Sequence, residues 1–64
     1  MLYRNLEAEL KRKGITRRKL ANLLGINIMT VSSKLNGKTE LKFDEAKKIA
    51  AELDNQDLNY LFEK

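Results

Sequence analysis

The chain has 64 residues, enough for one domain but not for two, and a domain of this size cannot enclose a substrate cleft without giving up much of its core. Its composition, 42% hydrophobic and 34% charged, is that of a folded globular chain. Cysteine and histidine are both absent, which removes disulfides, the common zinc ligands and His-dependent nucleophiles, so we expect no enzyme, cofactor, metal or small-molecule ligand. No apolar run approaches the roughly 20 residues that span a bilayer, which predicts a soluble, cytoplasmic chain.

The net charge of +4 is unevenly distributed along the chain. Residues 1–10 carry a net charge of −1, residues 11–42 carry +8 and residues 43–64 carry −3. A basic block between acidic flanks indicates a surface that faces a polyanion. Three of its cations have an alternative role, since positive side chains in the last turn of a helix favour the negative end of the helix dipole; they are Lys11, Arg12 and Lys13.

Apolar residues at helical spacing predict an all-α fold, a compact bundle of about five short helices. The first stripe predicts a helix over residues 2–13 that ends at Gly14 in a left-handed C-cap. The second follows Thr16, a good N-cap, and stops at Gly25 about two turns later. The apolar positions of these two helices are Leu2, Leu6, Leu10, Leu20, Ala21, Leu23 and Leu24.

The third helix starts at Asn27, another N-cap candidate, and runs to about Leu35, with Asn36-Gly37 as its stop. Its apolar stripe contains Ile28 and Val31 as well as Leu35. The angular position of Ile28 on this stripe favours packing in the core over contact with a ligand.

The fourth helix begins near Phe43, and we expect Asn55 to end it in the left-handed conformation, within the polar segment Asp54-Asn55-Gln56. Asp57 is then a plausible N-cap for one or two final turns. The apolar positions of these two helices are Phe43, Ala46, Ile49, Ala50, Leu53, Leu58, Tyr60, Leu61 and Phe62.

Only Gly25-Ile26-Asn27 separates the second helix from the third. So short a link forces two helices to cross steeply, at about 90 to 120°, as in a helix-turn-helix. Ala21 is small where the third helix must approach the second, and Gly25 permits the positive φ that the turn requires.

This pattern resembles that of the Cro/CI (XRE) family of phage and bacterial DNA-binding regulators. The residues that carry the resemblance are Thr16, Leu20-Ala21, Leu24-Gly25-Ile26, Val31 and Leu35-Asn36-Gly37-Lys38. The basic loop, the fourth helix and the apolar last turn extend it to residues 2–63. The resemblance implies one DNA-binding domain over residues 1–64, with its motif at about 16–37, acting on double-stranded DNA as a sequence-specific transcription regulator.

The resemblance implies that the third helix, about residues 27–36, enters the major groove. The face opposite its apolar stripe supplies the base-reading candidates Asn27, Met29, Thr30 and Ser33. The family often has Gln, Asn, Ser or Arg at the first exposed positions, where this chain has Ile28-Met29. An apolar side chain there can meet a thymine methyl group.

Phosphate contacts are expected from the start of the second helix and from the segment around the end of the third. The candidates are Arg17, Arg18, Lys34, Asn36, Lys38 and Lys42. Lys19 is a further, secondary candidate.

Proteins of this build usually pair on a palindrome whose half-sites lie about 34 Å apart, so we expect a homodimer on DNA. The apolar residues near the C-terminus exceed what one short helix needs to bury. The candidate dimer contacts are Leu58, Tyr60, Leu61 and Phe62.

Two other functions are compatible with the sequence to different degrees. A protein-interaction module of the same fold, such as an antitoxin or anti-repressor with weak DNA binding, is suggested by the apolar pair Ile28-Met29. A small enzyme has no pocket or nucleophile-base pair to support it.

Overall fold

The computed structural model describes residues 2–55 and 57–64. These residues form five α-helices and no strand: α1 (Arg4–Lys13), α2 (Arg17–Leu24), α3 (Ile28–Leu35), α4 (Phe43–Glu52) and α5 (Leu58–Leu61). The predicted all-α bundle of about five short helices is therefore confirmed. Gln56, which the sequence analysis places in the polar stop after the fourth helix, lies outside the described residues.

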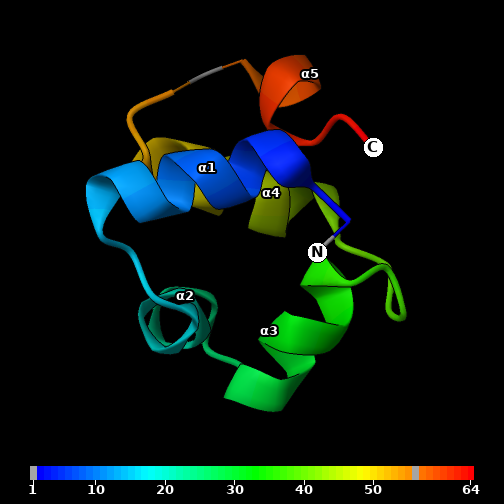
Figure 1. Cartoon of the computed structure of the whole chain (residues 1–64). Coiled ribbons are helices and arrows are strands. Elements are labelled where there is room, and N and C mark those ends of the chain that lie inside the picture. Colours follow the sequence, from blue (N-terminus) through cyan, green and yellow to red (C-terminus); the bar gives the residue numbers. More distant parts are fainter. Residues whose placement is uncertain (1, 56) are drawn as a thin grey trace.

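The five helices of the described residues surround one shared core (Figure 1). α2 packs against α3 and α4, and α5 packs against α1 and α4. In Figure 1, α2 and α3 lie on one side of the molecule, below α1 and α5. Every helix contributes at least one fully buried side chain to the core: Leu6, Leu20, Val31, Leu35, Ile49, Leu53 and Leu61.

All three predicted N-caps are present. The Thr16 hydroxyl accepts a hydrogen bond from the Lys19 N–H at 3.2 Å, and the Asp57 carboxylate accepts one from the Tyr60 N–H at 3.1 Å. At the start of α3, Oδ1 of Asn27 accepts from the N–H of Met29 at 2.7 Å. Because these bonds satisfy backbone groups that a helix leaves open, they fix the starts of α2, α3 and α5.

The end of α4 differs from the prediction by one residue. Asp54, not Asn55, has the left-handed backbone, with φ 55°. Its N–H donates to the Ala51 carbonyl, and the N–H of Asn55 donates to the Ala50 carbonyl at 3.0 Å, which together make a Schellman motif. Asn55 is used differently, since its Oδ1 accepts the N–H of Asp57 at 3.0 Å and so leads the chain into α5.

Leu2 and Tyr3 are not helical, although the sequence predicts helix there, because Leu2 binds the end of α3. The N–H of Leu2 donates to the Leu35 carbonyl at 3.0 Å, and α1 begins only at Arg4. The Leu2 side chain lies over Gly37, where a Cβ atom would come within 2.8 Å of Leu2 Cδ2. The φ of 81° at Gly37 favours glycine, and a Cβ there would in addition have to push aside the end of the Leu2 side chain.

Two apolar residues assigned to the core are exposed. Ile28 is 41% exposed and Phe43 is 66% exposed. Each is the first residue of its helix, and its side chain faces solvent rather than the core. The Phe43 ring instead lies 5.5 Å from the ammonium nitrogen of Lys47, within the range of a cation–π contact.

Within the described residues, no helix combines the length and the apolar character needed to cross a membrane.

Replacing Gly37 by alanine should destabilise the fold more than replacing Gly25. Both substitutions place a Cβ at positive φ, which costs about 1–2 kcal/mol. A Cβ at Gly25 meets no atom within 4 Å, whereas one at Gly37 displaces Leu2, for a further loss of about 1 kcal/mol. Urea unfolding of G25A, G37A and L2A/G37A measures this. The further loss should disappear against the L2A background; equal losses in G25A and G37A would contradict the Leu2 contact.

Candidate nucleic-acid interface

The link between α2 and α3 has the geometry of a helix-turn-helix. Gly25 has φ 69°, and the N–H of Ile26 donates to the Ala21 carbonyl at 3.0 Å. Ala21 is buried, so only a methyl group separates the backbone of α2 from its neighbours there. Figure 1 looks nearly along the axis of α2 while α3 runs across the view, so the two helices cross steeply, as predicted.

The first turn of α3 presents apolar and amide groups to solvent. Met29 is 75% exposed, and Ile28 and Asn27 are exposed beside it. Since Oδ1 of Asn27 caps the helix, its NH2 group is the part of the side chain left wholly available to a ligand. Thr30 and Ser33, the other two predicted base-reading residues, are half-buried.

Arg17 connects the start of α2 to α3. Its Nη1 donates to the hydroxyl of Ser32 at 3.2 Å; Arg17 is exposed and Ser32 is half-buried. One hydrogen bond uses one of the five N–H donors of a guanidinium, so the rest of the group can bind an anion beside α3. The Thr16 cap occupies the N–H of Lys19, and the N–H groups of Arg17 and Arg18 have no backbone acceptor among residues 2–55 and 57–64.

Four other predicted phosphate-binding residues are exposed. Arg18 is exposed on α2, and Asn36, Lys38 and Lys42 are exposed in the segment that follows α3. No ion pair involves these three cations within the described residues. Lys19 differs, because its ammonium pairs with Glu52 of α4 at 3.1 Å.

Lys34 does not fit the prediction that it contacts phosphate. The residue is 6% exposed, its ammonium lies 3.1 Å from Oε1 of Glu45, and it also donates to the carbonyl of Glu40 at 3.1 Å. A lysine on the edge of the apolar stripe can turn its long stem inward, and here an acid and a carbonyl receive its charge there. We therefore withdraw Lys34 from the set of phosphate contacts.

Glu45 is shared by two donors. Its Oε1 accepts the N–H of Lys42 at 3.0 Å, at the start of α4, as well as the ammonium of Lys34. Burial raises the pKa of this carboxyl group, but the Lys42 N–H and the charge of Lys34 outweigh burial, so the pKa lies below its ordinary value.

The sequence does not predict the roles of Ser32 and Glu45. A helical wheel does not tell which flank of the α3 stripe faces α2, so nothing distinguishes Ser32 from Ser33 as the partner of Arg17. Glu45 follows its N-cap position by three residues, the spacing of a capping box, but the N-cap residue is Lys42 rather than serine or threonine. That spacing is the signal that could have identified Glu45.

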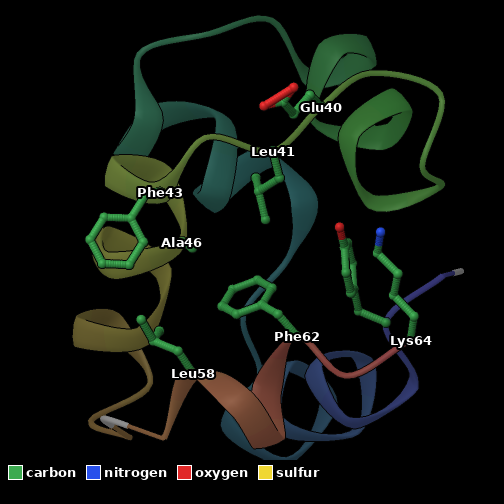
Figure 2. Close-up of a pocket in the computed structure, with 8 residues that line it drawn as sticks. Glu40, Leu41, Phe43, Ala46, Leu58, Phe62 and Lys64 are labelled. Atoms are coloured by element: carbon green, nitrogen blue, oxygen red, sulfur yellow. The ribbon is translucent and has the colours of Figure 1, made fainter.

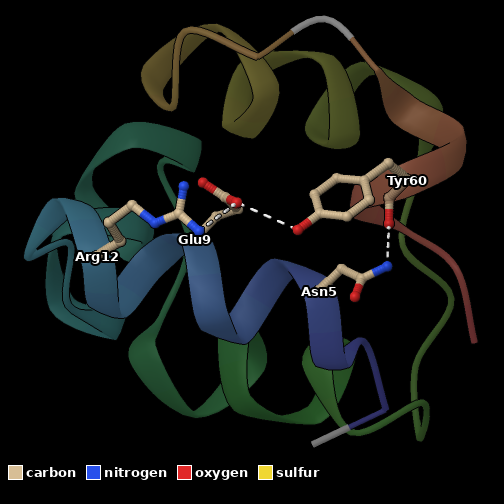
Figure 3. A network of polar contacts seen from close by, with 4 residues as sticks. All are labelled: Asn5, Glu9, Arg12 and Tyr60. Carbon is tan, nitrogen blue, oxygen red and sulfur yellow. Dashed lines mark hydrogen bonds and ion pairs between the residues drawn. The ribbon is translucent and has the colours of Figure 1, made fainter.

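The predicted dimer contacts are largely used within the monomer. Leu61 is fully buried, so it cannot contact a partner, and that part of the prediction is wrong. The Tyr60 hydroxyl donates to the buried carboxylate of Glu9 at 3.2 Å, and Asn5 donates to the Tyr60 carbonyl at 2.9 Å (Figure 3). Arg12 pairs with the same carboxylate at 3.4 Å. Burial raises the pKa of Tyr60, and the bond to Glu9 raises it further.

An apolar groove remains open between the start of α4 and α5 (Figure 2). Its volume is about 450 Å³, and Glu40 and Lys64 line it as well as apolar side chains. Leu58 and Phe62 are half-buried in it, and the Phe62 ring packs edge-on against Tyr3 with the centroids 5.5 Å apart. The remaining lining residues are Tyr3, Leu41, Phe43 and Ala46.

Within residues 2–55 and 57–64, no group of three histidine, cysteine, aspartate or glutamate side chains is arranged to hold a metal ion.

Two short, steeply crossed helices joined by a three-residue turn, with basic side chains around the exposed face of the second helix, define a DNA-binding helix-turn-helix protein. The family model described as helix-turn-helix matches residues 6–61. The chain therefore belongs to this helix-turn-helix family, in its Cro/CI-like (XRE) form, which confirms the resemblance in the sequence. It is a DNA-binding regulator of XRE type. No curated protein and no solved structure matches the chain.

Replacing Glu45 by glutamine should make the free energy of unfolding depend less on pH in the acid range. Because the folded-state pKa of Glu45 is lowered from 4.5, its ionised form stabilises the wild-type protein above that pH, and this contribution is lost as the pH falls through the folded-state pKa. Glutamine can still accept the Lys42 N–H but carries no charge. E45Q should lose roughly 1–3 kcal/mol at neutral pH. Urea unfolding between about pH 3 and 7 tests this.

Glu40→Gln is the matched control, because it removes an exposed carboxylate from the segment just before α4. Its profile should run parallel to that of wild type. An E45Q profile parallel to wild type would contradict the assigned role of Glu45.

Proposed function

We propose that the protein is a sequence-specific transcription regulator of phage Cro/CI type, a single DNA-binding domain over residues 1–64 whose motif spans about residues 16–37. The observation that carries this proposal is the exposed first turn of α3, beside Arg17 and ahead of the basic segment 36–42. A helix fits the major groove, and its N-terminal residues reach base edges there. The protein would act by occupying an operator and excluding or recruiting polymerase.

The chemistry of the first turn of α3 suggests what it reads. Met29 and Ile28 expose apolar side chains that match the methyl group of thymine, while the Asn27 NH2 group can donate to a base acceptor. Thr30 and Ser33, which are half-buried, would follow on the same helix. We therefore expect an A·T pair opposite Met29 in each half-site.

Phosphate contacts would hold this helix in register. With Lys34 withdrawn, the set is Arg17, Arg18, Asn36, Lys38 and Lys42, which includes four exposed cations. Neutralising four phosphates gives a slope of log K against log salt of about −3.6 per monomer.

We also propose that the protein pairs as a homodimer through the groove between α4 and α5. Leu58 and Phe62 lie in the groove, and the 66% exposed ring of Phe43 stands at its edge (Figure 2). Tyr60 is 38% exposed, and its hydroxyl is already bound to Glu9, so only part of its side chain could contact a partner. Glu40 and Lys64 in the same groove give a two-fold partner opposite charges to pair with.

A second candidate function is a protein-interaction module of the same fold, an antitoxin or anti-repressor with weak DNA binding. The observation that favours it is the exposed apolar pair Ile28 and Met29, which would suit a protein surface as well as thymine.

Arg17→Ala and Met29→Ala should affect DNA binding in different ways. R17A removes a phosphate contact, so it should weaken binding to all duplexes alike and make the salt slope about 1 unit shallower. M29A should leave the slope unchanged and lose discrimination, of about 1–3 kcal/mol, at one or two base pairs. The measurement is selection from random duplexes, followed by titration of the selected site and its single mutants at two salt concentrations.

Lys48→Ala, an exposed cation on α4, is the control and should change neither quantity. Equal and salt-independent effects of R17A and M29A would contradict the placement of α3 in the groove. If no half-site or palindrome is enriched, the interaction-module function replaces the proposed one.

Phe43→Lys should weaken dimerisation at micromolar concentration. The ring is exposed, so the monomer loses little on substitution, while an ammonium group in an apolar dimer contact would be unpaired. Sedimentation velocity with the operator duplex absent and present measures the change. Ala51→Lys, at an exposed position on the same helix, is the control and should dimerise like wild type. An unchanged dimer in F43K would exclude this groove as the contact.

A further inference from the structure

The segment between α3 and α4 has few means of holding its shape. It contains Asn36 to Lys42, and all of these residues except Leu41 are exposed. At its start, the N–H groups of Lys38 and Thr39 donate to the Ser33 carbonyl at 2.9 and 3.3 Å. At its end, the Lys42 N–H donates to Glu45. Between these points, the backbone carbonyl of Glu40 accepts its hydrogen bond from a residue outside the segment.

That donor is the side chain of Lys34. Its ammonium reaches from α3 to the Glu40 carbonyl at 3.1 Å and to Oε1 of Glu45 at 3.1 Å. The side chain is 7% exposed, so little water competes for these bonds. One buried cation thus joins three places: the last turn of α3, the middle of the segment and the first turn of α4.

We propose that Lys34 is a positioning residue for DNA binding, which holds segment 36–42 against α3 so that Lys38 and Lys42 can reach phosphate while α3 occupies the groove. This inference rests on the proposed function for its DNA-binding consequence, and on the contacts above for its structural one. It assigns to Lys34 an indirect role, in place of the direct phosphate contact predicted from the sequence.

The energetics of buried ion pairs support a role in position rather than in stability. Desolvation of two charges offsets much of their attraction, so a neutral pair in the same place is often as stable. What the neutral pair lacks is a donor aimed at the Glu40 carbonyl. K34M/E45Q removes both charges and keeps an acceptor for the Lys42 N–H, so it separates the two roles.

The first test needs no DNA. Amide hydrogen exchange should be about tenfold faster at Lys38 and Thr39 in K34M/E45Q than in wild type, because the bond to a charged donor that closes the segment is gone. Exchange at Leu10 in α1 should be unchanged, which shows that the fold is intact. Unchanged exchange at Lys38 and Thr39 would overturn the proposal, whatever the protein binds.

The second test is a double-mutant cycle on the salt slope for the selected duplex. K38M should make the slope shallower by about 0.9 in wild type and by much less in the K34M/E45Q background, because Lys38 is already displaced there. A Lys34 that contacts phosphate itself would give additive effects and overturn the proposal. K48M is the control for loss of one charge and should leave the slope unchanged in both backgrounds.

The two proposals fail in different ways. A wild-type protein that shows no salt-dependent binding to any duplex contradicts the proposed function, and the exchange test still decides the role of Lys34. If the protein binds DNA normally but the effects of the Lys34 and Lys38 substitutions on the salt slope are additive, only the positioning role is contradicted.

Discussion

The fixed crossing of α2 and α3 is the constraint on which the rest of the molecule depends. Ala21 keeps the two backbones close, its carbonyl accepts the N–H of Ile26, and Gly25 turns the chain with a left-handed backbone. Interiors are packed as densely as organic crystals, so α3 cannot rotate about this link without opening a void around Leu20 and Val31. The outward direction of Met29 follows from that packing, because the opposite side of α3 is already in the core.

The far end of α3 is held by two further contacts. An eight-residue helix is too short to be stable alone, so its ends must be satisfied by the rest of the protein. Its last four carbonyls all have partners: that of Leu35 binds the N–H of Leu2, and the three before it bind N–H groups of the segment that follows. The side chain of Lys34 adds a bond from α3 to that segment. Residues from both sides of α3 in the sequence thus meet at the end of one short helix.

The elements predicted correctly are those governed by local rules. Thr16, Asn27 and Asp57 cap helices because a short polar side chain can reach an N–H two or three residues ahead, and this needs no knowledge of the fold. Apart from the one-residue shift at the end of α4, the errors concern residues whose place depends on a neighbouring element. Phe43 is exposed at the side of an open groove between α4 and α5, and Lys34 is buried because Glu45 and Glu40 meet its ammonium. A helical wheel gives the angle of a side chain but not what stands opposite it, so the exposed face of α3 was predictable and the partners Ser32 and Glu45 were not.

Pairing of charges changes what the basic block offers to a polyanion. Within the described residues, four of the nine cations at positions 11–42 lie beside an acid: Lys11 with Glu7, Arg12 with Glu9, Lys19 with Glu52 and Lys34 with Glu45. All of these acids come from the acidic flanks of the sequence, so folding brings the flanks onto part of the block. The cations outside these pairs include Arg17 and Arg18 before α3 and Lys38 and Lys42 after it. Because exposed charges act over about 10 Å at ordinary salt, the unpaired cations next to α3 dominate the field that a phosphate backbone meets there, and the total of +8 does not.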